Sequence, residues 1–133
     1  INFTIVGETG LKVSDFINLE PNVKVTGVQT KYQIKELYQK NQFYFQGSRL
    51  EGLPNSLCEA MLCGCIPIGS RVFGIPDTIG KTGFLFDTEK DLDQIADFIN
   101  ADLGEGNYKK ARNRIIKKYE ISKRAEKIKQ NIS

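Results

Sequence analysis

The chain of 133 residues contains no histidine and only three cysteines, Cys58, Cys63 and Cys65, which share one apolar segment. A structural zinc site normally takes four ligands from cysteine, histidine or carboxylate, and the first two types supply only three here. We therefore interpret the cysteines as buried free thiols that pack as small hydrophobic residues. Free thiols are typical of a reducing compartment, so we expect a cytoplasmic protein without a bound metal.

Long hydrophobic runs are also absent. No apolar run approaches the roughly 20 residues that a membrane-spanning helix needs, and no signal peptide opens the chain. Residues 1–6 already have the pattern of a core strand, and the chain begins without methionine. We expect residues 1–133 to form a single domain, long enough to bury a real core, that was cut at its N-terminus from a longer protein.

The net charge of +3 hides a gradient along the chain. Residues 108–133 carry ten Lys or Arg against two Glu, a charge of +8, which leaves −5 for residues 1–107. We interpret this basic tail, with helices at about 107–131, as a solvated helix face. Contact with phosphate groups at the inner face of a membrane is the alternative, and nucleic acid is not an expected partner.

Hydrophobic periodicity predicts strands that alternate with helices. The expected strands cover residues 2–6, 23–26, 42–46, 65–69 and 83–86. The expected helices cover residues 11–19, 33–40, 55–63, 91–103, 107–119 and 122–131, while residues 73–78 are expected to form a tight loop. Asn55 has the chemistry of an N-cap, and Gly64 that of a residue that ends a helix. This order favours an α/β fold, a Rossmann-like parallel sheet with helices on both faces.

Ligands of such sheets bind beyond the carboxyl ends of the strands. Three loops are expected at that edge: the one after Val6, residues 47–55 and residues 70–77. Each contains glycine, which lets a ligand approach the backbone closely.

Two carboxylates flank the start of the expected helix at residue 55. Glu51 lies in the loop, and Glu59 lies eight positions later, about one turn into the helix. The unpaired N–H groups of Asn55, Ser56 and Leu57 suit a diphosphate. Glu59 is then placed to accept hydrogen bonds from a ribose diol, and Glu51 from hexose hydroxyls. The backbone of Gly52 and Leu53 offers N–H groups to the same sugar, so the pattern suits a nucleotide-sugar.

The string E-G-L-P-N-S-L-C-E-A-M from Glu51 to Met61, followed by Gly64, resembles the E-x7-E signature of retaining glycosyltransferases of family 4 (group 1). These are GT-B enzymes with two Rossmann-like domains. Pro67 falls one position later than the commoner spacing. The resemblance covers residues 1 to about 121, and further matching segments are FTIVG at 3–7, VTGV at 25–28, ELY at 36–38, GIP at 74–76 and GFL at 83–85.

The resemblance implies a role for each candidate residue. Glu51 is the catalytic residue and contacts the donor hexose, while Glu59 contacts the ribose. The backbone at Gly52, Leu53, Asn55, Ser56 and Leu57 meets the sugar and the diphosphate, and the loop at Val28 borders the base. Family members need no metal and no cofactor besides the donor. This agrees with the lack of an Asp-x-Asp motif beside a strand, since the one at residues 91–93 opens a helix. Asp77 departs from the usual Glu of G-I-P-E.

The resemblance also implies missing parts. The Arg and Lys that hold the diphosphate in the family precede the FTIVG strand, and the acceptor-binding N-terminal domain precedes them. The chain is thus expected to be the C-terminal, donor-binding half of a hexosyltransferase. The parent enzyme would transfer a hexose with retention from a UDP-, GDP- or ADP-sugar to a glycan, lipid-linked or protein acceptor, as in polysaccharide biosynthesis. The isolated piece is expected to be inactive.

Other interpretations of the same residues remain open. The main alternative is a non-catalytic nucleotide-sugar-binding or interaction module of the same fold. A nucleotide-sugar epimerase shares the architecture but is not expected to keep the E-x7-E spacing. Gly7 and Gly10 are half of a dinucleotide fingerprint that lacks its third glycine. The two glutamates also have the chemistry of a glycosidase acid–base pair, which the fold signal disfavours.

Overall fold

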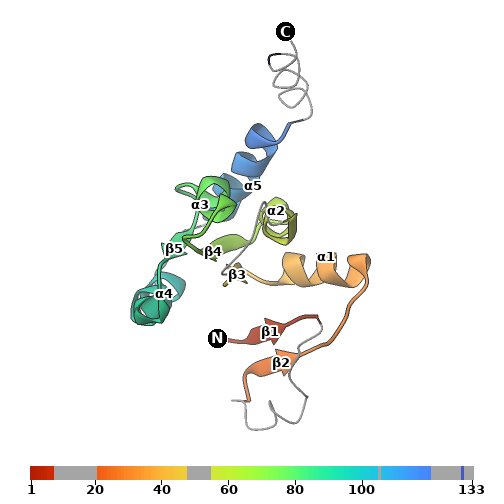
Figure 1. The fold of residues 1–133 in the computed structure, drawn as a ribbon. Helices are drawn as coiled ribbons and strands as arrows, with labels where there is room; N and C mark the ends of the chain where they lie inside the picture. The colour runs from red at the N-terminus through yellow and green to blue at the C-terminus, as the bar shows by residue number, and fades with distance from the viewer. Residues whose placement is uncertain (8–20, 48–54, 105, 121–129, 131–133) are drawn as a thin grey trace. The chain divides into compact units, whose positions relative to one another are not determined.

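The computed structural model describes residues 1–7, 21–47, 55–104, 106–120 and 130 of the chain. The chain forms two compact units, Ile1–Glu36 and Leu37–Ser133. Both contain parallel strands, and the long helix α1 crosses the boundary between them (Figure 1).

The first unit holds two of the predicted strands. β1 (Phe3–Ile5) pairs in parallel with β2 (Val23–Val25), with Phe3 opposite Val23. Both strands are confirmed, although each is shorter than predicted. The predicted helix at residues 11–19 lies outside the described residues.

Helix α1 (Lys31–Lys40) begins two residues before the predicted start at Gln33. Thr30 and Gln33 form a reciprocal capping pair at its N-terminus. The Gln33 N–H donates to Thr30 Oγ1 at 3.3 Å, and the Thr30 N–H donates to Gln33 Oε1 at 2.9 Å. This T-x-x-Q capping box satisfies two backbone donors and therefore fixes where the helix begins.

The second unit is built on a three-stranded parallel sheet of β3 (Phe43–Gln46), β4 (Ile66–Ser70) and β5 (Phe84–Phe86), in the order β3-β4-β5. All five residues of the central strand β4 are buried. Pro67 is tolerated there because pairing with β5 begins only at Ile68, so no β5 residue stands opposite the missing N–H.

Helices cover both faces of this sheet, as the sequence predicts (Figure 1). Three of them, α2 (Asn55–Leu62), α3 (Gly74–Ile79) and α5 (Asn107–Lys118), pack on the face that carries Tyr44 and Leu85. Their shared core consists of Leu57, Met61, Ile75, Ile79, Ala111 and Ile115. Successive residues of a strand face opposite sides, so Phe43 and Phe84 face the other way. There they meet Phe98 of α4 (Leu92–Asn100), with ring centroids 6.1 and 5.2 Å away.

The end of α2 confirms the role predicted for Gly64. The N–H of Gly64 donates to the Met61 carbonyl at 3.0 Å, and the N–H of Cys65 donates to the Ala60 carbonyl at 3.0 Å. This is the Schellman pattern, which requires a left-handed residue, and Gly64 has φ of 94°.

The prediction of a tight loop at residues 73–78 is wrong, because residues 74–79 form α3. Gly74 and Pro76 suggested a turn, but Pro76 is the third helical residue, where no intrahelical N–H bond is needed. Burial favours the helix over a loop. Ile75 and Ile79, four residues apart, are both fully buried and pack over Gly69 of β4.

Two other helix bounds differ from the prediction. The helix predicted over residues 91–103 covers only Leu92–Asn100, after a single 3-10 turn at Glu89–Asp91. The Asp91 carboxylate caps that turn by accepting from the backbone N–H groups of Asp87 and Thr88. The helix predicted over residues 107–119 is confirmed as α5, while the one over residues 122–131 falls almost wholly outside the described residues.

Candidate functional site

The first turn of α2 lies at the carboxyl edge of the second sheet. β3 and β4 are parallel neighbours, so the segments that follow them emerge at the same edge. Asn55 and Ser56 are exposed there, while the Leu57 side chain is fully buried in the core. The first two residues of this turn are therefore exposed, and Leu57 anchors the turn in the core. Asn55 is the first helical residue of α2, so the prediction that it is the N-cap is wrong.

Glu59 is exposed in the middle of α2, close to an aromatic pair. Burial raises the pKa of the Tyr38 phenol, and the neighbouring Tyr44 and the Glu59 carboxylate raise it further. The rings of Tyr38 and Tyr44 pack edge-to-face with their centroids 5.7 Å apart. The Tyr44 hydroxyl donates to Gln46 Oε1 at 2.7 Å. Tyr38 thus stays a neutral hydroxyl. Sequence reasoning missed this neighbour because the spacing of Tyr38 indicated only a helix face.

The other candidates on the E-x7-E segment, Glu51, Gly52 and Leu53, lie outside the described residues. The predicted pairing of Glu51 with Glu59 across the helix start therefore stays a prediction.

In the first unit, Val28 follows the end of β2. Gly7 and Gly27 end β1 and β2 with positive φ of 112° and 69°, and the Gly7 N–H donates to the Gly27 carbonyl at 2.9 Å. Val28 is 70% exposed, and Gln29 folds back to donate to the Thr26 carbonyl at 2.9 Å. The Val28 side chain is accordingly presented to solvent at the carboxyl end of a strand, where the sequence predicts a base.

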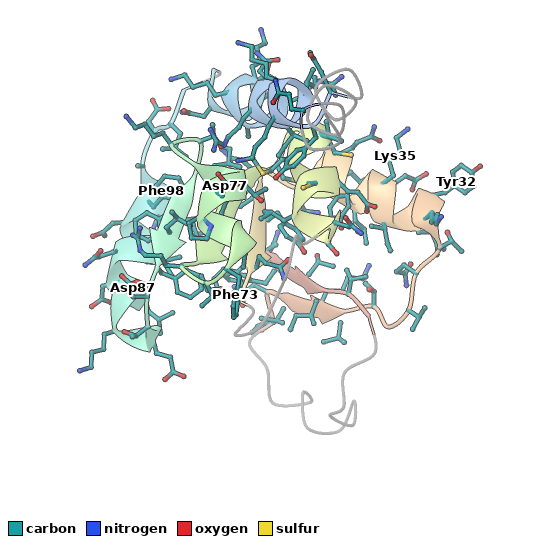
Figure 2. The ribbon with its side chains drawn as sticks, turned by 45° about the horizontal axis from the view of Figure 1, so that its top comes forward. Tyr32, Lys35, Phe73, Asp77, Asp87 and Phe98 are labelled. Carbon is teal, nitrogen blue, oxygen red and sulfur yellow. The ribbon has the colours of Figure 1, made fainter. Side chains whose placement is uncertain are left out.

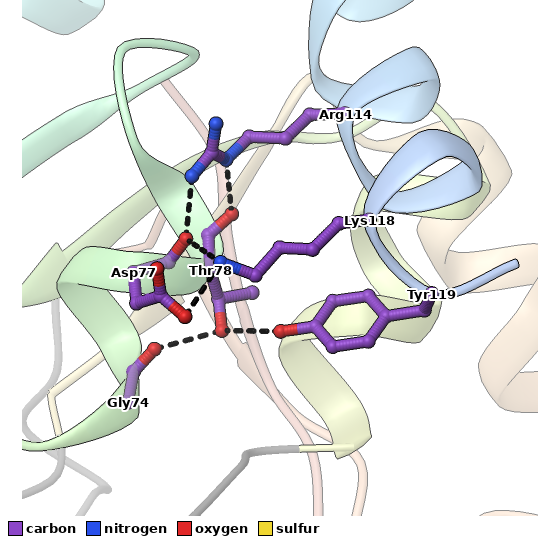
Figure 3. Close-up of polar contacts among 6 residues, drawn as sticks. All are labelled: Gly74, Asp77, Thr78, Arg114, Lys118 and Tyr119. Atoms are coloured by element: carbon purple, nitrogen blue, oxygen red, sulfur yellow. Dashed lines mark hydrogen bonds and ion pairs between the residues drawn. The ribbon is translucent and has the colours of Figure 1, made fainter. Parts of the chain in front are cut away.

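The loop predicted over residues 70–77 is shorter in the structure, because residues 74–77 belong to α3. α5 holds this helix in place (Figure 3). Arg114 donates from Nε to the Thr78 carbonyl at 2.8 Å and from Nη2 to the Asp77 carbonyl at 2.5 Å. Lys118 donates to the same Asp77 carbonyl at 2.9 Å and forms an ion pair with the Asp77 carboxylate at 2.5 Å. Asp77 thus helps to fix α3.

The basic face of α5 is partly structural. Arg112 donates to the Leu62 carbonyl at the end of α2 at 2.7 Å, and Arg114 and Lys118 bind α3. Lys110 and Lys117 are exposed and line a surface depression together with Asn113, Arg114 and Lys118. All five of these residues belong to α5, so this depression includes none of the candidate residues.

The cysteines are free, as expected. Cys65 is buried, donates through Sγ to the Tyr38 carbonyl at 3.1 Å, and has a pKa raised by burial to about 12. Burial also raises the pKa of Cys58. Within the described part of the chain, no group of three or more Cys, Asp or Glu is placed to hold a metal ion, and no helix is long and apolar enough to cross a bilayer.

Comparison with known proteins identifies a family whose model this chain matches. Residues 1–122 match the family model described as glycosyl transferases group 1. A search of curated proteins found no match.

Several solved structures share the fold. TarM is 30% identical with a TM-score of 0.82, and the match covers 98% of this chain and 28% of TarM. Alr3699/HepE of Anabaena, solved with UDP-glucose, is 18% identical with a TM-score of 0.74, covering 98% of this chain and 40% of that one. The pneumococcal O-GlcNAc transferase GtfA, solved with UDP and GlcNAc, is 23% identical with a TM-score of 0.73, covering 99% and 29%. The last two likenesses show the fold alone. The chain spans less than half the length of each of these proteins.

Proposed function

The chain belongs to the group 1 glycosyl transferases, and we propose that it binds the nucleotide-sugar donor of a retaining hexosyltransferase of family 4. The observation that carries the proposal is the first turn of α2. Asn55 and Ser56 are exposed in this turn, which lies at the carboxyl edge of a parallel sheet and is anchored by the buried Leu57.

This turn suits a diphosphate for electrostatic reasons. The first N–H groups of a helix have no intrahelical acceptor, and the aligned peptide dipoles leave about half a positive charge at that end. An anionic group there gains hydrogen bonds and a favourable field without a metal ion. A donor diphosphate placed against Asn55, Ser56 and Leu57 is therefore the ligand group that we propose for this turn.

We assign the two carboxylates different parts of the donor. Glu59 lies about 6 Å along the axis from the start of the helix by helical rise, which matches the reach from a diphosphate to the adjoining ribose. Glu51 is proposed to contact the hexose and to act in catalysis, with Gly52 and Leu53 as backbone donors to the same sugar. Val28 is proposed to border the base. The leaving phosphate oxygen would then assist transfer on the retained face of the sugar.

UDP-sugars are the first donors to test, since two proteins of the same fold were solved with UDP-glucose or with UDP and GlcNAc. The acceptor, a glycan, lipid or protein, is proposed to bind a second domain of the whole protein. The three free cysteines, of which Cys65 is buried and Cys58 and Cys63 are partly exposed, support a reducing compartment. The exposed lysines of α5 support contact with anionic lipid headgroups as a secondary proposal.

Thermal-shift measurements on the full-length protein that contains this chain test the proposal, with UDP-, GDP- and ADP-sugars as ligands. We expect at least one of these to raise the midpoint of unfolding. The Glu59→Gln variant should lose most of that shift, because a neutral amide accepts more weakly from the ribose diol than a carboxylate does. Asp97→Asn, which removes an exposed acid from α4, is the matched control and should keep it. If none of the three donors stabilises the protein, that result would count against the proposal.

Kinetics separate the roles of the two acids. Glu51→Ala should lower kcat more than it weakens nucleotide binding, whereas Glu59→Ala should mainly weaken binding. Equal losses of kcat and affinity in Glu51→Ala would contradict its assignment to the sugar. A protein that binds the donor but shows no transfer to any acceptor would instead support the alternative, a non-catalytic binding module.

A further inference from the structure

Phe73 has a backbone conformation that phenylalanine rarely adopts. It lies between β4 and α3 with φ of 44° and ψ of −124°, and it is the one described non-glycine residue with positive φ. The Ile75 N–H donates to the Val72 carbonyl at 3.2 Å, which closes the four residues from Val72 to Ile75 into a β-turn. The angles of Phe73 are those of the second residue of a type II′ turn, a position that favours glycine.

A side chain at this position has a steric cost that glycine avoids. With positive φ, Cβ crowds the neighbouring backbone, so a bulky residue here is held in place only by the surrounding structure. Ile75 and Ile79 supply that constraint, since both are fully buried against β4, and Arg114 and Lys118 hold the far end of α3. The strain at Phe73 is thus maintained by a well-packed helix.

Packing in the hydrophobic core does not explain why a phenyl ring occupies position 73. Phe73 is 69% exposed and is not part of the hydrophobic core, whose members include its neighbour Ile75. Figure 2 shows Phe73 beside the start of α3. The fold therefore carries the cost of a strained conformation and leaves the aromatic ring open to solvent.

The position of Phe73 indicates what the ring could contact. It follows the carboxyl end of β4, and α2 begins on the same side after the carboxyl end of the neighbouring parallel strand β3. Both lie in the second unit, so the ring shares the sheet edge with the open first turn of α2. This is the edge at which a ligand of a parallel α/β sheet binds.

We infer that Phe73 is a further donor-binding residue whose ring packs against a flat ring face of the nucleotide-sugar, either the base or the C–H face of the sugar. The inference rests on the proposed function and adds a residue that the E-x7-E motif does not include. An aromatic ring presents a large apolar surface with few rotatable bonds, so little conformational entropy is lost when a ligand ring packs on it.

Two variants separate the ring from the strain. Phe73→Gly removes both, so the free protein should unfold about 2 to 5 °C higher while donor affinity falls. Phe73→Leu keeps an apolar side chain in the strained position but removes the ring. By analogy with stacking of bases on aromatic side chains, we expect donor affinity to fall about 5-fold to 100-fold in both variants. Tyr108→Leu, which removes another exposed aromatic ring at the start of α5, is the control and should bind as the unaltered protein does.

The experiment is isothermal titration of the full-length protein and these variants with UDP and with UDP-glucose, alongside Glu59→Gln. Weaker binding of both ligands places the base or ribose on Phe73, and weaker binding of UDP-glucose alone places the hexose there. Unchanged affinity in both Phe73 variants, with Glu59→Gln still impaired, overturns the inference and leaves the proposed function standing. If the unaltered protein binds no UDP-, GDP- or ADP-sugar, the proposed function fails and the inference fails with it.

Discussion

Replacement of Arg114 by methionine tests how firmly α5 holds α3. Methionine keeps the apolar stem but removes the donors to the Thr78 and Asp77 carbonyls. A hydrogen bond from a charged group contributes about 1.5–3 kcal/mol. Two circumstances reduce the loss here: Lys118 still donates to the Asp77 carbonyl, and the Asp77 bond is exposed to water. We therefore expect Arg114→Met to lower the free energy of unfolding by about 1–2 kcal/mol, or the thermal midpoint by about 3–6 °C.

Lys110→Met on the same helix is the matched control. Lys110 is exposed, and its replacement should change stability by less than about 0.5 kcal/mol. Urea denaturation gives both free energies, and constant slopes in the two titrations would show that the comparison is valid. If Arg114→Met destabilises the protein no more than Lys110→Met does, the contacts in Figure 3 do not anchor α3 and the reasoning is refuted.

Three further predictions concern local structure. Gly64→Ala should destabilise the protein by about 1–2 kcal/mol in a thermal or urea titration, because φ of 94° is unfavourable for alanine, and unchanged stability would contradict the Schellman end of α2. Cys65 should resist alkylation by iodoacetamide at pH 8 in the folded protein and react after unfolding, as mass spectrometry can show, because its pKa is raised to about 12; rapid reaction in the native state would be inconsistent with its burial. Backbone N–H groups of Thr88 and Asp87 lower the pKa of Asp91, so its contribution to stability is present above its unfolded pKa of about 3.9 and is lost as pH falls through the lower folded value. The stability difference between the unaltered protein and Asp91→Ala should therefore shrink below about pH 4, and a difference that persists at pH 2 would refute the cap.

Local chemistry made much of the fold predictable. The strands at residues 43–46 and 66–70 are short apolar runs bounded by turn residues, and Gly64 ends α2 because no other residue adopts its φ as easily. The T-x-x-Q capping box of α1 is also visible in the sequence, although the periodicity alone placed the start of the helix two residues late. In each case the decisive interactions lie within a few residues.

Features that depend on tertiary contacts could not be predicted. α3 was missed because Gly74 and Pro76 indicate a turn locally, whereas burial of Ile75 and Ile79 on β4 stabilises a helix. Tyr38 and Glu59 lie on different helices, α1 and α2, so the effect of the Glu59 carboxylate on the Tyr38 pKa arises only in the folded chain.

The conformation of Phe73 gives no sequence signal either, since the side chain is one that its turn disfavours. For the candidate site, the motif predicts ligand contacts at residues of α2, which stays a prediction, and the structure adds the surroundings of these residues.

Hydrogen exchange measured by mass spectrometry tests the donor site most directly. In the free protein, the N–H groups of Asn55 and Ser56 in the first turn of α2 should exchange quickly, because they lack intrahelical acceptors and both residues are exposed. The second half of the same helix, around the buried Met61, should exchange slowly and serves as an internal control. With saturating UDP-sugar, or with whichever nucleotide-sugar binds, we predict slower exchange at Asn55 and Ser56. Bound nucleotide-sugar that leaves exchange at this turn unchanged would contradict the proposed site.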